Sequence, residues 1–286
     1  MGKYRKILVA IDGSPSSFHA LKESFKLAKD EKAWVTVVSV IPRYEGDLGS
    51  MWINNIKEAM SKPCTIALSE AQKIAKGEGV AIKTVCEEGE IYERIIDLAD
   101  AENCDIIVMG RKGMSLIGRS LIGSVTSRVI GYSQKDVLVV PEGSSVGWRT
   151  ILLATDGSRY SESASSRAID CAKAYGGDLY ALAVIDIPPE FYSHVKALDT
   201  ADNLLKNAKA IVDKIKKQAE AQGIKTETYT KEGEPSKVIT DLAREKVCDV
   251  IFIGSHGRTG LKRLLMGSVA EKVIGHSHCP VLVASV

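Results

Sequence analysis

Two glycine-rich segments share the spacing G-x2-G-x9-G-S, from Gly110 to Ser124 and from Gly254 to Ser268. Each follows an apolar run that predicts a buried strand and precedes a stretch that predicts a helix. Glycine allows a positive φ and close approach of a ligand, and the unpaired N–H groups at a helix start attract anions. The spacing therefore favours phosphate binding, although a Gly-Ser pair before a helix also occurs simply as a helix cap.

An Asp-Gly-Ser sequence ends the first apolar run of each half of the chain, at Asp12 and at Asp156. Its carboxylate can accept hydrogen bonds from ribose hydroxyls or from a base, or can form the Asx turn that this sequence favours. Ligands of open parallel sheets bind beyond the carboxyl ends of the strands, where the strand order reverses. We therefore expect the Asp-Gly-Ser turn and the glycine segment of each half to face one cleft.

The motifs that the sequence lacks narrow the chemistry of this cleft. Neither half contains GxxxxGK[ST], and neither has GxGxxG after its first apolar run, which argues against a P-loop and against dinucleotide binding. The two glycine segments contain no Asp or Glu, so they offer no general base and no acidic metal ligand. We expect any Mg²⁺ or Mn²⁺ to be held mainly by phosphate oxygens, and we expect binding rather than rapid hydrolysis.

Basic residues differ between the two segments. Arg119 and Arg263 occupy equivalent positions, where they could offset phosphate charge or lie on a solvated flank. The first segment also carries Arg111 and Lys112, where the second carries a smaller serine and a histidine. We therefore expect the two sites to differ in affinity.

One internal repeat accounts for the paired motifs. The stretch from Ile7 to Ser14 recurs as Ile151 to Ser158, 144 residues later, and the same offset relates the two glycine segments. A period of this length indicates a duplicated domain rather than a solenoid. We expect domains at residues 1–141 and 150–286, joined by a turn-rich linker at residues 142–149.

Apolar runs alternate with amphipathic stretches along each half of the chain. This pattern predicts a parallel sheet covered by helices on both faces, and these elements must position the motifs. The expected strands of the first domain are about 6–11, 34–40, 81–86, 106–110 and 136–140, and those of the second are about 150–155, 178–185, 225–230, 250–254 and 280–284. The expected helices are 17–30, a long one ending near 76, 91–101 and 124–132, with counterparts 144 residues later. The fold class is α/β, with two tandem doubly wound five-stranded parallel sheets.

Composition is that of a globular protein. Of 286 residues, 45% are hydrophobic and 26% are charged, and the net charge of +2 gives no reason to expect nucleic acid as a partner. The apolar run near the amino terminus is too short for a signal core, and no run approaches the roughly 20 apolar residues that span a membrane. We expect a cytoplasmic protein without a membrane span.

The six cysteines form no CxxC pair. We expect them to be free, buried thiols in a reducing compartment. His276, His278 and Cys279 resemble metal-ligand spacing, but the first half has tyrosine, glutamine and lysine at the equivalent positions. We therefore expect no metal site there.

Two segments depart most from the repeat, at about residues 42–55 and 186–200. Trp52 in the first segment, and Phe191 and Tyr192 in the second, could flank a ligand, dock a partner or pack the loop onto its own domain.

The glycine segment, the strand that ends in Asp-Gly-Ser and the closing strands Val137 to Val140 and Val281 to Val283 together resemble the universal stress protein family. The resemblance covers nearly the whole chain in two units. It implies an adenine nucleotide alpha hydrolase-like sheet of order 3-2-1-4-5 that binds ATP, AMP or ADP across strands one and four. It also implies an intramolecular pseudo-dimer packed through the last strands, with a further homodimer left open.

The resemblance assigns roles by matching positions. Asp12 and Asp156 would contact the adenosine moiety, Val40 and Val184 would line the adenine pocket, and Gly110 and Gly254 would approach the ribose. The phosphates would be received by Gly113, Gly123, Ser124, Val125, Gly257, Gly267, Ser268 and Val269. We expect a regulatory ATP-binding stress protein. A slow ATPase or nucleotidyl-transferring enzyme of the same fold group, and a scaffold with empty pockets, are the alternatives.

Overall fold

A computed structural model describes residues 4–43, 53–114, 121–186, 196–257 and 266–286, with side chains described from residues 60 and 202 onward in the two long helices. The chain divides into two compact units between Ser144 and Ser145. Among the described residues, no helix is both long and apolar enough to cross a membrane.

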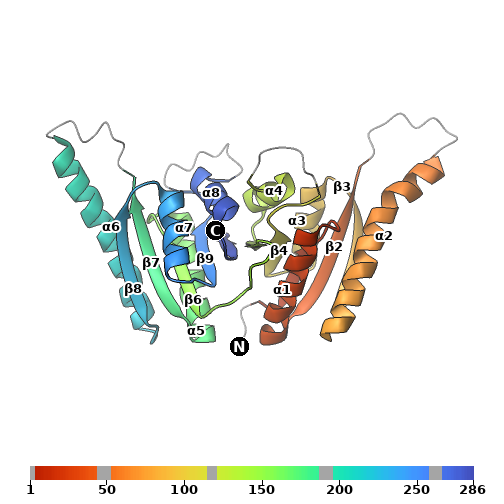
Figure 1. The fold of residues 1–286 in the computed structure, drawn as a ribbon, viewed down its shortest axis with the longest axis horizontal. Coiled ribbons are helices and arrows are strands. Elements are labelled where there is room, and N and C mark those ends of the chain that lie inside the picture. Colours follow the sequence, from red (N-terminus) through yellow and green to blue (C-terminus); the bar gives the residue numbers. More distant parts are fainter. Residues whose placement is uncertain (1–3, 44–52, 115–120, 187–195, 258–265) are drawn as a thin grey trace. The chain divides into compact units, whose positions relative to one another are not determined.

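The described residues of unit 1 form a five-stranded parallel sheet with four helices (Figure 1). Its strands are β1 (Lys6–Ala10), β2 (Trp34–Pro42), β3 (Ile82–Gly89), β4 (Ile106–Gly110) and β5 (Asp136–Val140). Its helices are α1 (Pro15–Glu31), α2 (Ile53–Glu78), α3 (Ile91–Ala101) and α4 (Ser124–Tyr132). The strand order is β3-β2-β1-β4-β5, so the order reverses between β1 and β4.

Unit 2 repeats this architecture. Its strands are β6 (Thr150–Ala154), β7 (Asp178–Ile185), β8 (Thr226–Glu232), β9 (Val250–Gly254) and β10 (Val281–Ala284). Its helices are α5 (Arg159–Tyr175), α6 (Lys196–Glu220), α7 (Pro235–Glu245) and α8 (Ser268–His276). The strand order is β8-β7-β6-β9-β10, and in both units it confirms the predicted 3-2-1-4-5 fold class.

The helices cover both faces of each sheet. In unit 1, α1 packs against α2 and α3 packs against α4. Right-handed crossovers in opposite directions along the sheet place these two pairs on opposite faces. The central strands are therefore buried on both sides, as Ile7, Leu8 and Val9 of β1 show with no exposed surface.

The first helix of each unit begins directly at the Asp-Gly-Ser turn. Ser14 caps α1, and its Oγ accepts a hydrogen bond of 3.2 Å from the N–H of Ser17. Ser158 caps α5 in the same way through Ser161. The glycine of each turn has a positive φ, +88° at Gly13, which only glycine adopts without strain.

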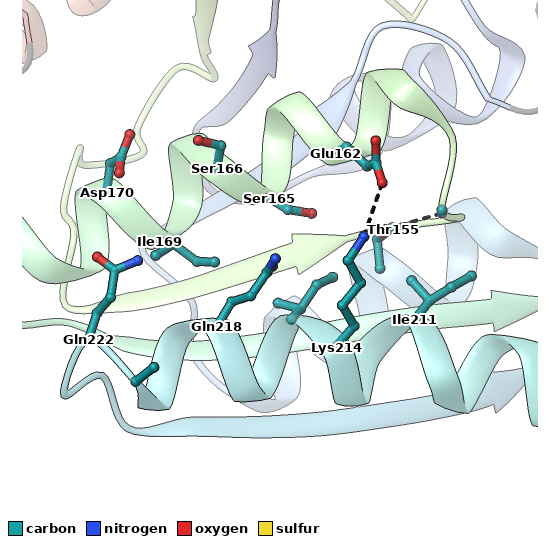
Figure 2. A pocket seen from close by; sticks show the side chains of 13 residues that line it. Thr155, Glu162, Ser165, Ser166, Ile169, Asp170, Ile211, Lys214, Gln218 and Gln222 are labelled. Atoms are coloured by element: carbon teal, nitrogen blue, oxygen red, sulfur yellow. Dashed lines mark hydrogen bonds and ion pairs between the residues drawn. The ribbon is translucent and has the colours of Figure 1, made fainter.

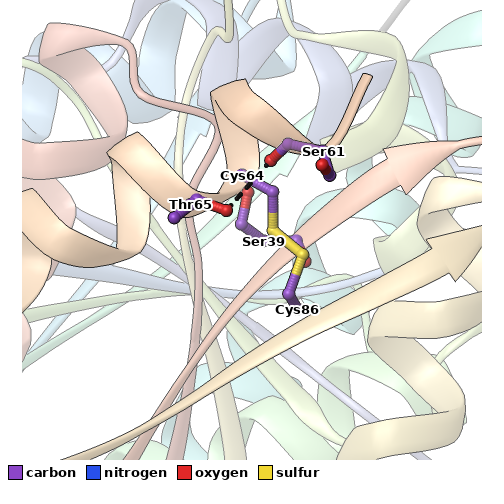
Figure 3. The surroundings of a disulfide bond; sticks show 5 residues. All are labelled: Ser39, Ser61, Cys64, Thr65 and Cys86. Carbon is purple, nitrogen blue, oxygen red and sulfur yellow. Dashed lines mark hydrogen bonds between the residues drawn. A yellow bond between two sulfur atoms is a disulfide. The ribbon is translucent and has the colours of Figure 1, made fainter. Parts of the chain in front are cut away.

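The prediction of six free thiols is wrong for two of them. Cys64 of α2 and Cys86 of β3 form a disulfide (Figure 3). Cys86 lies beside Ser39 in the β2–β3 register, and the Cys64 Sγ atom lies 3.5 Å from the Ser39 carbonyl oxygen. The tertiary fold, rather than a motif spacing, brings the two sulfurs together.

The other four cysteines are free and buried, as predicted. Burial raises the thiol pKa to about 11 for Cys104, about 12 for Cys248 and about 11 for Cys279. These thiols are therefore poor nucleophiles at neutral pH.

The predicted aromatic residues of the two non-repeating segments, Trp52, Phe191 and Tyr192, lie outside the described residues. The segments themselves lead into the long helices, because α2 begins at Ile53 and α6 begins at Lys196.

Candidate functional site

The Asp-Gly-Ser turn and the glycine segment of unit 1 meet at the carboxyl edge of its sheet. β1 and β4 are neighbours, with Ala10 beside Met109 in the register. The two loops that follow these strands therefore leave the same edge at the point where the strand order reverses, as the sequence predicts.

Asp12 links the two loops directly. Its Oδ1 accepts a hydrogen bond of 3.0 Å from the N–H of Ser14, which forms the Asx turn. Its Oδ2 accepts a bond of 2.8 Å from the N–H of Met114, which belongs to the glycine segment. The carboxylate thus forms the local turn and also holds a loop from across the sheet edge.

Gly110 and Gly113 are required for different reasons. A Cβ on Gly110 would lie 2.6 Å from Ser16 Oγ and 2.9 Å from the Ser16 carbonyl carbon, so this glycine lets β4 approach α1. A Cβ on Gly113 would overlap Asp12 Oδ2. The second glycine therefore lets the loop close over the Asp12 carboxylate.

Gly123 and Ser124 form the start of α4. The Gly123 N–H donates 2.9 Å to the Arg111 carbonyl oxygen, which closes the glycine segment on itself. Gly123 is the N-cap, and α4 has no side-chain cap among the described contacts. Ser124 is the first helical residue and is exposed. The Gly-Ser pair therefore does not act as a serine cap, and the first N–H groups of α4 are not capped by a side chain.

Unit 2 repeats the Asx turn, the close approach at the second glycine and the closure of the glycine segment. Asp156 Oδ1 accepts 3.0 Å from the Ser158 N–H, and a Cβ on Gly257 would lie 2.9 Å from Asp156 Oδ2. The Gly267 N–H donates 2.8 Å to the Ser255 carbonyl oxygen. Gly267 caps α8, and Ser268 is its first residue and is exposed.

The remaining predicted residues lie around the same two edges. Val40 on β2 and Val184 on β7 are half-buried near the carboxyl ends of the strands beside β1 and β6. Val125 and Val269 are the half-buried second residues of α4 and α8. Gly254 ends β9, where a Cβ would lie 2.7 Å from the Tyr160 carbonyl carbon. Arg119 and Arg263 lie outside the described residues.

Unit 2 has an aromatic cluster that the motif analysis missed. The Tyr160 ring lies 5.1 Å from the His256 ring, and the Arg159 guanidinium lies over Tyr160 at 4.9 Å. The His256 Nδ1 is 3.1 Å from Ser255 Oγ. Unit 1 has Ser16 at the position equivalent to Tyr160, so comparing the two copies position by position would have found this difference.

A second feature that the sequence did not indicate is a cavity of about 690 Å³ in unit 2, between α5 and α6 (Figure 2). Its lining includes Thr155 and Gly157, which flank Asp156.

Metal ligands are not grouped in the described parts of either unit, where no cluster of three His, Cys, Asp or Glu side chains could hold an ion. In the His-x-His-Cys stretch, the His276 Nδ1 instead lies 2.8 Å from the Lys272 carbonyl oxygen. Burial is the main cause that lowers the pKa of His278.

Comparison with known proteins identifies the family. The model of the universal stress protein family matches residues 3–141 and again residues 147–285. A universal stress protein of Mycolicibacterium smegmatis is 28% identical over 290 residues, covering 97% of this chain and 96% of that protein. Universal stress protein MJ0531 of Methanocaldococcus jannaschii is 40% identical over 138 residues, covering 48% of this chain and 81% of that protein.

A solved structure agrees at the level of the fold. The crystal structure of a universal stress protein from Archaeoglobus fulgidus has a TM-score of 0.75 and 24% identity, and the match covers 98% of this chain and 96% of that one. With two family domains in one sequence and the expected sheet in each unit, the chain belongs to the universal stress protein family as a tandem member.

Proposed function

We propose that each unit binds one adenine nucleotide, ATP, ADP or AMP, and that nucleotide occupancy, rather than turnover, is the basis of a regulatory role in stress response. The observation that carries the proposal is the position of Asp12, whose carboxylate receives N–H bonds from both the β1 turn and the glycine segment. This joins a polar turn, a glycine loop and a helix start in one place, which suits a ligand with both a nucleoside and phosphates.

The described geometry fits such a ligand in its details. The first N–H groups of α4 and α8 lack a side-chain cap, and Gly123 lies against the backbone of the glycine segment, since a Cβ there would meet the Arg111 carbonyl oxygen and the Gly113 amide nitrogen at 3.6 Å. We assign the phosphates to Gly113, Gly123, Ser124 and Val125, and to Gly257, Gly267, Ser268 and Val269. We assign the ribose to the neighbourhood of Gly110 and Gly254, and the adenosine side to Asp12, Val40, Asp156 and Val184.

The hydrogen bonds of the Asp12 carboxylate favour nucleotide binding over hydrolysis. Both Asp12 oxygens accept backbone N–H bonds, so this carboxylate serves to join the two loops, a structural role rather than that of a general base. The glycine segments contain no carboxylate. When present, Mg²⁺ or Mn²⁺ would be held by phosphate oxygens and the hydroxyl of Ser124 or Ser268.

The first test measures nucleotide content and stoichiometry. The purified protein is denatured, released nucleotide is identified by chromatography, and the stripped protein is titrated with ATP by calorimetry. We expect two nucleotides per chain. Absence of any bound or bindable adenine nucleotide at millimolar ATP would contradict the proposal.

Two matched variants assign the sites. Gly123→Val places a side chain where the α4 phosphate would lie, at a φ of −62° that valine accepts. Gly267→Val is the counterpart at α8, where the added Cβ is more tightly packed, 3.2 Å from the Ser255 carbonyl oxygen. We expect each variant to bind one nucleotide and the double variant to bind none, with circular dichroism showing that all remain folded. Sustained multiple-turnover hydrolysis that the double variant loses would instead favour the enzyme alternative.

A further inference from the structure

The cavity of unit 2 is a groove with an apolar floor and a polar rim. Ile169 of α5 and Ile211 and Ile215 of α6 form apolar parts of its lining. The polar lining residues are Glu162, Ser165, Ser166, Asp170, Lys214, Gln218 and Gln222. Figure 2 shows Lys214 and Gln218 of α6 directed toward α5, with Lys214 paired with Glu162. Its volume of about 690 Å³ is in the range of small-molecule sites, roughly 300–1,000 Å³.

The groove follows from substitutions on α5 relative to α1. The residues 144 positions before Glu162, Ser165 and Ile169 are Phe18, Leu21 and Phe25. Leu21 and Phe25 are buried in unit 1, with 0% and 1% of their surface exposed. Unit 2 therefore has three smaller or more polar side chains at positions where α1 has two phenylalanines and a leucine.

Larger side chains on α6 fill only part of the space that the smaller α5 side chains leave. At the same offset, α2 has Ala67 and Ala71 where α6 has Ile211 and Ile215. Both alanines are buried in unit 1, where α1 packs directly against α2. In unit 2 the larger isoleucines reach toward α5 but leave the cavity between the helices.

On its solvent side, the groove is bridged by an ion pair between α5 and α6 rather than by apolar packing. Lys214 Nζ lies 3.4 Å from Glu162 Oε1, and both side chains are about two-thirds exposed, at 65% and 64%. Such a pair contributes little to stability and opens at low cost. Ser165 is buried, but its hydroxyl donates 2.7 Å to the Ser161 carbonyl oxygen within α5, so the α5 wall presents few polar atoms at this level.

One end of the groove is continuous with the adenosine side of the proposed nucleotide site. Thr155 and Gly157 line the cavity and are the chain neighbours of Asp156. α6 packs on β7, the strand whose carboxyl end carries Val184. The glycine segment follows β9, on the other side of β6, and none of its described residues line the cavity.

We propose that the second unit accepts adenine nucleotides that carry an extended, mainly aliphatic substituent on the base, and that the first unit excludes them. This rests on the proposed nucleotide binding at Asp156. The substituent lies along Ile169, Ile211 and Ile215, and its polar end reaches Gln218 and Gln222. From Glu162 to Asp170 the groove runs eight residues along α5, about 12 Å, which suits a chain of six to eight atoms.

The test compares ATP with ATP analogues that carry a six-carbon aminoalkyl chain on the exocyclic amine or on C8. Calorimetry is carried out on the Gly123→Val protein, which isolates unit 2, and on the Gly267→Val protein, which isolates unit 1. We expect at least one analogue to bind unit 2 with affinity close to that of ATP and to bind unit 1 at least about tenfold more weakly.

Variants that restore the α1 residues test the groove itself. Ser165→Leu, alone and with Glu162→Phe, fills the groove without changing a residue assigned to the nucleotide. We expect these variants to keep ATP affinity and to lose roughly tenfold or more of the analogue affinity in unit 2. Ala174→Leu, an exposed position on the same helix outside the groove, is the matched control and should change neither affinity.

The outcomes separate the two proposals. If ATP itself does not bind, the proposed function fails and this inference fails with it. If ATP binds but both analogues are refused by unit 2, or are accepted equally by both units, only this inference is overturned. If the folded Ser165→Leu/Glu162→Phe variant still binds the analogues with full affinity, this inference is overturned as well.

Discussion

The glycines of the motif do not form one functional class. Gly110 is packed against Ser16 and Gly113 against Asp12, whereas Gly123 has ordinary clearance on all sides. Gly110 therefore serves the packing of β4 on α1 and Gly113 the closure of the loop over Asp12, whereas Gly123 would accept a Cβ at ordinary contact distance. A substitution at each position should consequently be measured by a different property.

Gly110→Ala should lower the free energy of unfolding. The new Cβ would contact Ser16 Oγ at 2.6 Å and backbone atoms at 2.9 Å, and overpacking of this kind costs about 1–3 kcal/mol. Urea unfolding measures the effect. Gly77→Ala is the control, because it lies in α2 with no atom within 4 Å of the added Cβ, and should be neutral or slightly stabilising. Equal stability of the two variants would contradict the packing role.

At the scale of elements, the disulfide fastens α2 to β3 in unit 1 only. The equivalent residues of unit 2 are Ala208 and Thr230. The bond closes a loop with a sequence separation of 22, which in the chain-entropy model stabilises the folded state by about 3 kcal/mol.

Reduction should therefore destabilise unit 1 and leave unit 2 unchanged. Thiol titration of the denatured protein should give four thiols before reduction and six after it, because Cys104, Cys171, Cys248 and Cys279 are free. Cys86→Ser should show the same loss of stability without a reductant. Six titratable thiols in the unreduced protein would show that the bond is absent in solution.

Glu102, which follows α3, connects that helix to two strands through Thr36 and Lys83. The hydrogen bond from Lys83 is the main cause that lowers the pKa of the Glu102 carboxyl. Because the folded pKa lies below the unfolded value of about 4.3, this carboxylate stabilises the fold at neutral pH, and the contribution is lost as the pH falls below about 5.

Glu102→Gln should therefore reduce the loss of stability on acidification. The urea midpoints at pH 7 and pH 4 measure this loss of stability. The control is Glu88→Gln, which removes an exposed carboxylate on β3, the edge strand that also carries Lys83. The expected result is a smaller difference between the two midpoints for Glu102→Gln than for the control. The same difference in both proteins would contradict the role of this contact.

Sequence reasoning identified the features that repeat at a fixed offset and missed those that depend on tertiary neighbours. The duplicated motifs and apolar runs predicted the two domains, their strands and the meeting of Asp12 with the glycine segment, whereas the strand order came from the resemblance to the family. The partnership of Cys64 with Cys86 depends on the β2–β3 register, which no local pattern encodes. The unit 2 groove depends on which faces of α5 and α6 oppose each other. These faces can be identified only when the packed helices are compared with α1 and α2.

At the scale of the molecule, the two units share a site geometry and differ around it. Unit 1 has the disulfide beside β2 and a packed α1–α2 contact, whereas unit 2 has the His256–Tyr160 cluster and the groove. Each unit also has its own buried sheet. Nucleotide binding in one unit should therefore stabilise that unit specifically.

Trp148 allows this to be measured for unit 2. It is 5% exposed and stacks on Tyr175 at 5.5 Å, whereas Trp34 is 77% exposed and should report little of the unfolding of unit 1. In a Trp52→Phe background, tryptophan emission should follow the thermal unfolding of unit 2. ATP at about 100 times its Kd stabilises an occupied site by about 2.7 kcal/mol. We expect ATP to raise the Trp148 transition in the Gly123→Val protein and to leave it unchanged in the Gly267→Val protein. A shift of equal size in both would show that the nucleotide acts on unit 2 from outside its own site.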